Sequence, residues 1–156
     1  MARKGLAVVC VVMVSLGLVA GVVQAEDNRW SMDADGVITD SQTGLQWHVG
    51  PNYVGWDEAR SYCRDLSVAG GGWRMPTMDE LRGVWTGYDN FDSHYSMPPA
   101  CNAKELNIWW VWSSERCDFS TAWGLNFYMG KKEWSSRTYA AAYCRVFAVR
   151  SQGYWR

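Results

Sequence analysis

The sequence predicts an α+β domain in which two helices pack on antiparallel sheets beside a long irregular loop region. Three observations predict it. Two segments carry apolar residues at helical spacing, and five short segments are rich in aromatic and β-branched residues. These segments follow the order strand, strand, helix, helix, loop, strands, which is typical of an α+β domain rather than of alternating parallel units.

The first predicted element is a hairpin formed by residues 37–40 and 45–47. β-Branched and aromatic residues flank a turn at Thr43 and Gly44, which are suited to a tight reversal. Three further strands are expected in the second half of the chain, at residues 108–113, 122–128 and 143–149.

The first helix is expected over residues 56–66, with one apolar face made of Trp56, Ala59, Cys63 and Leu66. A second, shorter helix is expected to begin at Thr77, where Thr77 and Glu80 form a capping box and satisfy each other's backbone amides. The tryptophans of the hairpin and helix motifs are expected to be packing residues, because large rigid side chains fill small cores: Trp47, Trp56, Trp73 and Trp85.

Residues 1–25 have the pattern of a signal peptide. Arg3 and Lys4 precede an uncharged apolar run, and small residues before Glu26 suit cleavage after Ala25. We expect an exported protein, periplasmic or extracellular, whose single domain covers residues 26–156 and has no membrane span after cleavage. The alternative is an uncleaved anchor helix, since the run is long enough to cross a bilayer core.

The charge balance argues against a nucleic-acid partner. Loss of Arg3 and Lys4 leaves 13 basic against 16 acidic residues, so the average surface potential is negative. An acidic partner would therefore have to be met by a local cluster of cations.

Four cysteines remain after Cys10 leaves with the signal, namely Cys63, Cys101, Cys117 and Cys144. Export makes them disulfide candidates, and four cysteines permit three pairings. The absence of a C-x-x-C motif argues against a thioredoxin-type redox pair and against a close-paired zinc site.

The segment from Tyr88 to Asn107 has neither helical nor strand periodicity, and long loops of this kind are often functional. Asp89, Asn90 and Asp92 offer oxygen atoms of the type that calcium prefers, although three polar residues in a turn are also explained by the turn alone. We expect no cofactor and no metal, with calcium at these oxygens as the alternative.

Six motifs, in this order, resemble the Lcl C-terminal domain family, which is named after a bacterial collagen-like adhesin. The motifs are ITDSQTGLQWH, WDEARSYCRDL, GGWRMPTMDELRGVW, WWVWSSE, TAWGLNFYMG and YCRVFAVR, and the resemblance covers about residues 36 to 150. It implies a fold similar to C-type lectins and to the formylglycine-generating enzyme.

The resemblance also implies a disulfide pairing. A C-type lectin-like fold ties the first helix to the last strand, which here joins Cys63 to Cys144 and leaves Cys101 to join Cys117. The chain-entropy treatment gives about 4 kcal/mol of stabilisation for the long loop and about 3 kcal/mol for the short one.

The favoured function is a binding module that recognises a glycan or a protein surface in an envelope or adhesive context, and not an enzyme. The alternatives are a structural subunit that packs against copies of itself and, less favoured, an enzyme similar to the formylglycine-generating enzyme. The expected ligand site lies on the long loop and its neighbouring strand, where acidic, imidazole and indole groups gather: Asp89, Asp92, His94, Trp109 and Trp110.

Overall fold

The fold is that of a computed structural model, which describes residues 29–85, 108–141 and 144–153. Its strands are β1 (Trp30–Met32), β2 (Ile38–Asp40), β3 (Leu45–Asn52), β4 (Trp110–Arg116), β5 (Thr121–Asn126), β6 (Lys131–Ser136) and β7 (Cys144–Ser151). Its helices are α1 (Trp56–Asp65), the single 3₁₀ turn η1 (Val68–Gly70) and α2 (Met78–Val84). No helix in this described part is long and apolar enough to cross a membrane.

The strands form one sheet in the order β1-β2-β3-β7-β4-β5-β6. Every neighbouring pair is antiparallel except β4 and β7, which run parallel and pair through Trp110 with Cys144 and Val111 with Arg145. Beyond these two pairs β4 and β7 separate, and Arg74 bridges to Val149 in the gap. The segment that joins α1 to α2 therefore enters the sheet between its two central strands.

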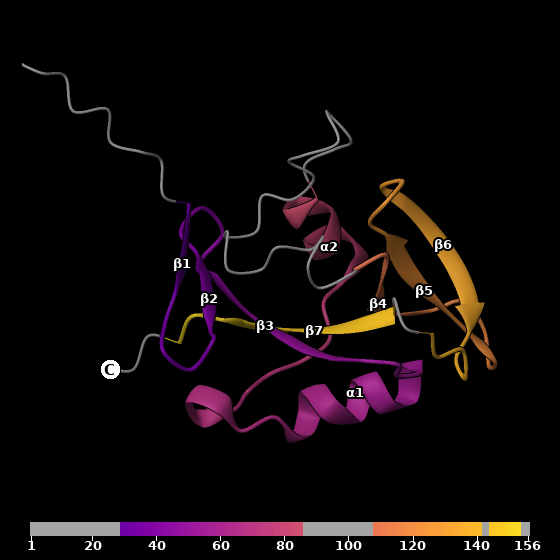
Figure 1. Cartoon of the computed structure of the whole chain (residues 1–156), viewed down its shortest axis with the longest axis horizontal. Helices are drawn as coiled ribbons and strands as arrows, with labels where there is room; N and C mark the ends of the chain where they lie inside the picture. Colours follow the sequence, from indigo (N-terminus) through magenta and orange to yellow (C-terminus); the bar gives the residue numbers. More distant parts are fainter. Residues whose placement is uncertain (1–28, 86–107, 142–143, 154–156) are drawn as a thin grey trace, which may run out of the picture.

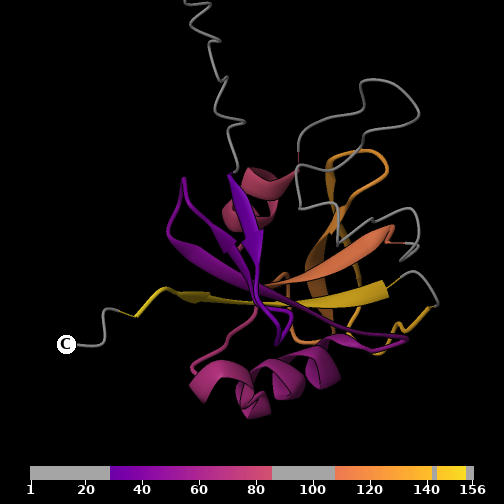
Figure 2. The ribbon, with the colours of Figure 1, turned by 60° about the vertical axis from the view of Figure 1, so that its left-hand side comes forward.

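The two helices cover opposite faces of the sheet, as Figures 1 and 2 show. Strand alternation sends Phe147 and Val149 of β7 into the core cluster that contains α2, and sends Val146 and Ala148 into the cluster that contains α1. The central strand β7 is consequently apolar on both faces.

The α+β prediction, with two helices packed on antiparallel sheets, is wrong. A single mixed sheet of seven strands dominates the described chain, and the helices have only 10 and 7 residues. The sequence patterns missed β1 and β6, the two edge strands. Strand β6 has exposed or half-buried side chains along its whole length, so it lacks the alternation of buried and polar residues that predicts a strand.

Several local features do occur where the sequence places them. Ile38 pairs with Trp47 across the first hairpin, whose turn contains Gly44 at a φ of 68°. At the start of α2 the Thr77 hydroxyl accepts from the Glu80 amide at 3.2 Å, and the Glu80 carboxylate accepts from the Thr77 amide at 2.8 Å. Short-range hydrogen bonds of this kind depend on few residues, which is why sequence alone indicates them.

Candidate functional site

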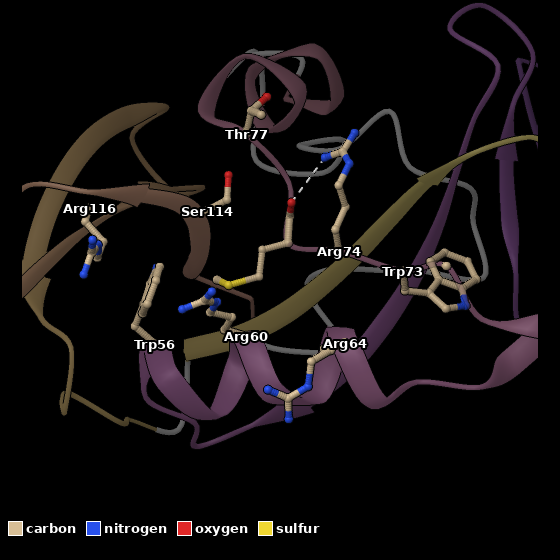
Figure 3. Close-up of a pocket in the computed structure, with 10 residues that line it drawn as sticks. Trp56, Arg60, Arg64, Trp73, Arg74, Thr77, Ser114 and Arg116 are labelled. Carbon is tan, nitrogen blue, oxygen red and sulfur yellow. Dashed lines mark hydrogen bonds between the residues drawn. The ribbon is translucent and has the colours of Figure 1, made fainter.

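A cleft of about 740 Å³ opens between α1, the connection that leads to α2, and the second half of β4. Four arginines line it, and Figure 3 shows that they come from three different elements. Arg60 and Arg64 belong to α1, Arg74 to the connection, and Arg116 to the last position of β4. Trp56, Trp73 and Met75 form an apolar floor and are each 5% exposed or less.

Helix α1 directs its two arginines into the cleft because of its spacing. Trp56, Ala59 and Cys63 face the core, which leaves Arg60 and Arg64 one turn apart on the neighbouring face. The start of the helix is fixed by Glu58, whose carboxylate accepts from the Gly55 amide at 3.0 Å.

Strand β4 is held against the start of α1 by two reciprocal hydrogen bonds. The Trp56 indole donates to the Ser113 carbonyl at 2.8 Å, and the Trp112 indole donates to the Val54 carbonyl at 3.0 Å. These bonds fix the direction in which β4 leaves the core, and so the place of Arg116 relative to α1.

The third wall is the segment between α1 and α2. The backbone of Arg74 exchanges two hydrogen bonds with Val149 of β7, at 3.0 and 2.8 Å. On the other side, the Ser114 amide of β4 donates to the Pro76 carbonyl at 2.7 Å. The segment is therefore anchored on both sides, and Arg74 reaches the cleft from a rigid backbone.

Two of the four arginines already form ion pairs with carboxylates. Arg64 pairs with Asp65 at 2.7 Å, and Arg74 makes a forked pair with Glu80 at 2.6 and 2.8 Å. The hydrogen bond from Arg74 holds the pKa of Glu80 below its usual range, and the same bond raises the pKa of Arg74.

Arg60 and Arg116 differ from that pair. Within the described residues neither guanidinium has an ion pair or a side-chain hydrogen bond; Arg60 lies with its Cζ 5.8 Å from the centre of the Trp56 ring. Arg137 also lies near this ring, with its Cζ 4.9 Å from the ring centre, and it pairs with Asp57. As far as the structure describes the chain, the cleft thus carries two positive charges without a carboxylate partner.

Of the predicted ligand-site residues, the two that the structure describes, Trp109 and Trp110, do not line this cleft. Trp109 is 51% exposed and stacks on Tyr128, with ring centroids 5.4 Å apart. Trp110 is only 7% exposed, because its ring packs on Gly124 and edge-on to Trp112, so it offers no surface for a ligand. The other expected residues, including the calcium candidates, lie outside the described residues: Asp89, Asn90, Asp92 and His94.

The residues expected to pack are buried or partly buried. Trp47, Trp56 and Trp73 are 1 to 5% exposed, and the half-buried Trp85 donates to the Phe127 carbonyl at 3.0 Å. Trp56 and Trp73 also line the cleft, a role that sequence reasoning did not give them. The signal that could have indicated the site is the pair Arg60 and Arg64 beside a buried tryptophan, whereas nothing local indicated Arg116.

The expected bond between Cys63 and Cys144 is not formed in this structure, where both are buried free thiols. Cys63 Sγ lies 3.7 Å from the carbonyl oxygen of Phe147, which is three residues, or about 10 Å of strand, beyond Cys144. Cys117 is an exposed free thiol, and its expected partner Cys101 lies outside the described residues.

Within the described ranges no three or more histidine, cysteine, aspartate or glutamate side chains gather as a metal site would require. The comparison with curated proteins finds no match. Residues 36–150 match the sequence profile of the Lcl C-terminal domain, and the chain therefore belongs to the Lcl C-terminal domain family.

Proposed function

We propose that this chain is an exported binding module whose arginine-lined cleft receives acidic groups of a glycan or a protein surface, in an envelope or adhesive context. The observation that carries the proposal is the pair Arg60 and Arg116, two guanidinium groups on one concave surface that have no carboxylate partner among residues 29–85, 108–141 and 144–153. A guanidinium presents a planar fork of donors that matches carboxylate, sulfate and phosphate oxygens.

The electrostatic setting supports an acidic ligand. The chain after residue 25 has more acidic than basic residues, so these arginines form a local cluster against the average charge. The buried floor beneath them, made of Trp56, Trp73 and Met75, lowers the local dielectric constant and so strengthens charge-assisted hydrogen bonds.

The lining favours binding over catalysis. The ionisable side chains along the described lining are arginines, which stay protonated and are unsuited to proton transfer. The remaining polar side chains are the hydroxyls of Thr77 and Ser114, which suit hydrogen bonding to a polar ligand.

The proposal is tested by titrating the purified chain with three acidic probes: a galacturonate oligomer, a sulfated dextran oligomer and a glutamate oligomer. Tryptophan fluorescence and calorimetry report binding. Because a hydrogen bond to a charged group contributes about 1.5 to 3 kcal/mol, Arg60→Ala or Arg116→Ala should weaken the preferred probe about 10- to 100-fold. Binding should also weaken as salt rises.

The matched control is Lys131→Ala, which removes an exposed cation from β6 that lines none of the hollows described here. It should leave the affinity unchanged. If it weakens binding as much as Arg60→Ala does, or if the double variant of Arg60 and Arg116 binds all three probes like the wild type, the cleft is not the site.

A further inference from the structure

A second hollow, of about 370 Å³, adjoins the arginine cleft. Gly72 and Arg74 line both, so the two hollows meet at this point of the connection between α1 and α2. Arg116 and Trp73 lie at opposite ends of the cleft (Figure 3). The second hollow continues from the Trp73 end, where it is lined by Arg150 of β7. We call the cleft and the second hollow together the long groove.

Arg150 holds its positive charge ready in this second hollow. Its guanidinium donates to the carbonyls of Ala69 and Gly71 at 2.8 and 2.6 Å, and to the side chain of Gln46 at 2.9 Å. These acceptors are uncharged, and no carboxylate pairs with Arg150 in the described part of the chain. Because the guanidinium is fixed before a ligand arrives, little entropy is lost when it binds one.

A wall of bare backbone, made of Gly70, Gly71 and Gly72, lines the second hollow. All three have φ between 78° and 88°, a conformation that favours glycine over residues with a side chain. A Cβ at Gly70 or Gly72 would meet nothing within 4 Å, so the space beside the backbone is open there. Among the described residues, none accepts a hydrogen bond from the Gly72 amide. The main chain of a ligand can therefore approach this wall closely.

The charge of the long groove has one sign. The ionisable side chains along its described lining are all arginines, from Arg116 at one end to Arg150 at the other. A ligand that follows the groove therefore gains most from acidic groups along its whole length.

The lining suits a polypeptide better than a polysaccharide. An indole platform for a sugar ring needs an exposed face, and Trp56 and Trp73 are only 3% and 5% exposed. The Cζ of Arg150 also lies over the Trp73 ring, 4.4 Å from its centre. An extended peptide uses what the groove offers, since its main chain can bond to backbone groups and its carboxylates to guanidinium groups.

We propose that the long groove binds an extended acidic segment of a partner polypeptide, which runs from Arg116 past the glycine wall to Arg150. This rests on the proposed function, because it names the partner of the same cleft and adds Arg150 as a further contact. In the described part of the chain, the cleft has two arginines without a carboxylate partner and the second hollow has one. A short acidic peptide therefore binds in the cleft, and a longer one reaches both hollows.

The experiment is calorimetric titration of the purified chain with glutamate oligomers of about four and about ten residues, which extend to about 13 and 33 Å. Arg150→Gln removes the charge of the second hollow, and Ser151→Glu adds an opposing charge at an exposed position of its lining. Each should weaken the longer oligomer about tenfold, the loss expected for one charge-assisted hydrogen bond, and leave the shorter one unchanged. Ser151→Glu removes none of the atoms to which Arg150 bonds, so it separates lost binding from a disturbed glycine wall.

The matched control is Lys131→Ala, which changes the net charge by the same amount and lines neither hollow. It should leave both affinities unchanged. The longer oligomer has more registers in which to bind, so the variants decide the question and the length alone does not. A galacturonate oligomer of about ten residues should bind more weakly than the glutamate oligomer of that length.

Failure of this proposal differs from failure of the proposed function. The cleft itself is excluded if the double variant of Arg60 and Arg116 binds every probe like the wild type. With the cleft intact, the extension to Arg150 is overturned if Arg150→Gln or Ser151→Glu binds the longer oligomer like the wild type, or weakens both oligomers equally. The choice of a polypeptide is overturned if the glutamate oligomers do not bind, or if the galacturonate oligomer binds more tightly.

Discussion

Gly124 of β5 lies against the indole of Trp110, and this contact predicts an unusual cost for a small substitution. A Cβ at Gly124 would lie 2.4 Å from Cε2 and 2.5 Å from Cζ2 of that ring. Non-bonded carbons pack at about 3.5 to 4.0 Å, so the ring would have to retreat by roughly 1 Å. It has no room, because it is 7% exposed and meets Trp112 edge-on at 5.4 Å.

We therefore expect Gly124→Ala to lower the free energy of unfolding by about 2 to 3 kcal/mol, the range of an overpacked core. This holds although replacing a strand glycine would otherwise stabilise by about 0.5 to 1 kcal/mol. For a domain of this size the melting temperature should fall by about 8 to 12 °C. Urea unfolding and calorimetry measure both quantities.

The control is another glycine-to-alanine change with the opposite expected sign. Gly83 lies inside α2 with open space around its Cβ position, so Gly83→Ala should stabilise by up to about 1 kcal/mol. A second test combines Gly124→Ala with Trp110→Phe, whose smaller ring removes the clash. The double variant should be more stable, by at least about 1 kcal/mol, than the sum of the two single effects on the free energy of unfolding. A Gly124→Ala protein as stable as the wild type, or strict additivity, would refute the packing argument.

Two further predictions concern titratable groups. The hydrogen bond from Arg74 depresses the folded-state pKa of Glu80, so its contribution to stability is present above the unfolded pKa of about 4.3 and is lost as pH falls through the folded pKa. As the pH is lowered from about 5 to about 3, the free energy of unfolding should therefore fall less for Glu80→Gln than for the wild type. Urea denaturation at several pH values measures this difference. Burial raises the pKa of Cys63 to about 12, so alkylation at pH 8 should label the exposed Cys117 and spare Cys63 in the native protein. Denaturation without reductant should then expose Cys63 to labelling, whereas a disulfide to Cys144 would keep it unreactive.

Elements specified by local signals were predictable from the sequence. The helical spacing that begins at Trp56 and the capping box at Thr77 each depend on a few neighbouring residues, and both occur where expected. The first hairpin follows from Gly44, whose positive φ suits glycine in a tight turn.

Features that depend on distant residues were not predictable. Strands β1 and β6 form because an edge position needs only one partner strand, and neither carries an alternating pattern. The parallel pairing of β4 with β7 involves two residue pairs only, with β5 and β6 lying between them in the sequence. This pairing makes the sheet mixed rather than purely antiparallel. Neither strand has a sequence pattern that indicates it.

The cleft belongs to this second group. Arg60 and Arg116 lie 56 positions apart in the sequence and are brought to one surface by tertiary contacts. As separate exposed arginines, each is explained by ordinary solvation. The proposal of a binding site depends on their lying together in one cleft.

The large number of tryptophans finds a physical reason in those tertiary contacts. Several indoles donate to a backbone carbonyl of another segment, as Trp56 does to Ser113, Trp112 to Val54 and Trp85 to Phe127. Each such residue buries a large apolar area while its indole N–H keeps a hydrogen-bond partner. Because the Trp56 and Trp112 bonds are reciprocal, they fix the start of α1 against β4 from both sides. In this family member the tryptophans thus hold in place the backbone from which the arginines extend, and we propose that the arginines meet the acidic ligand.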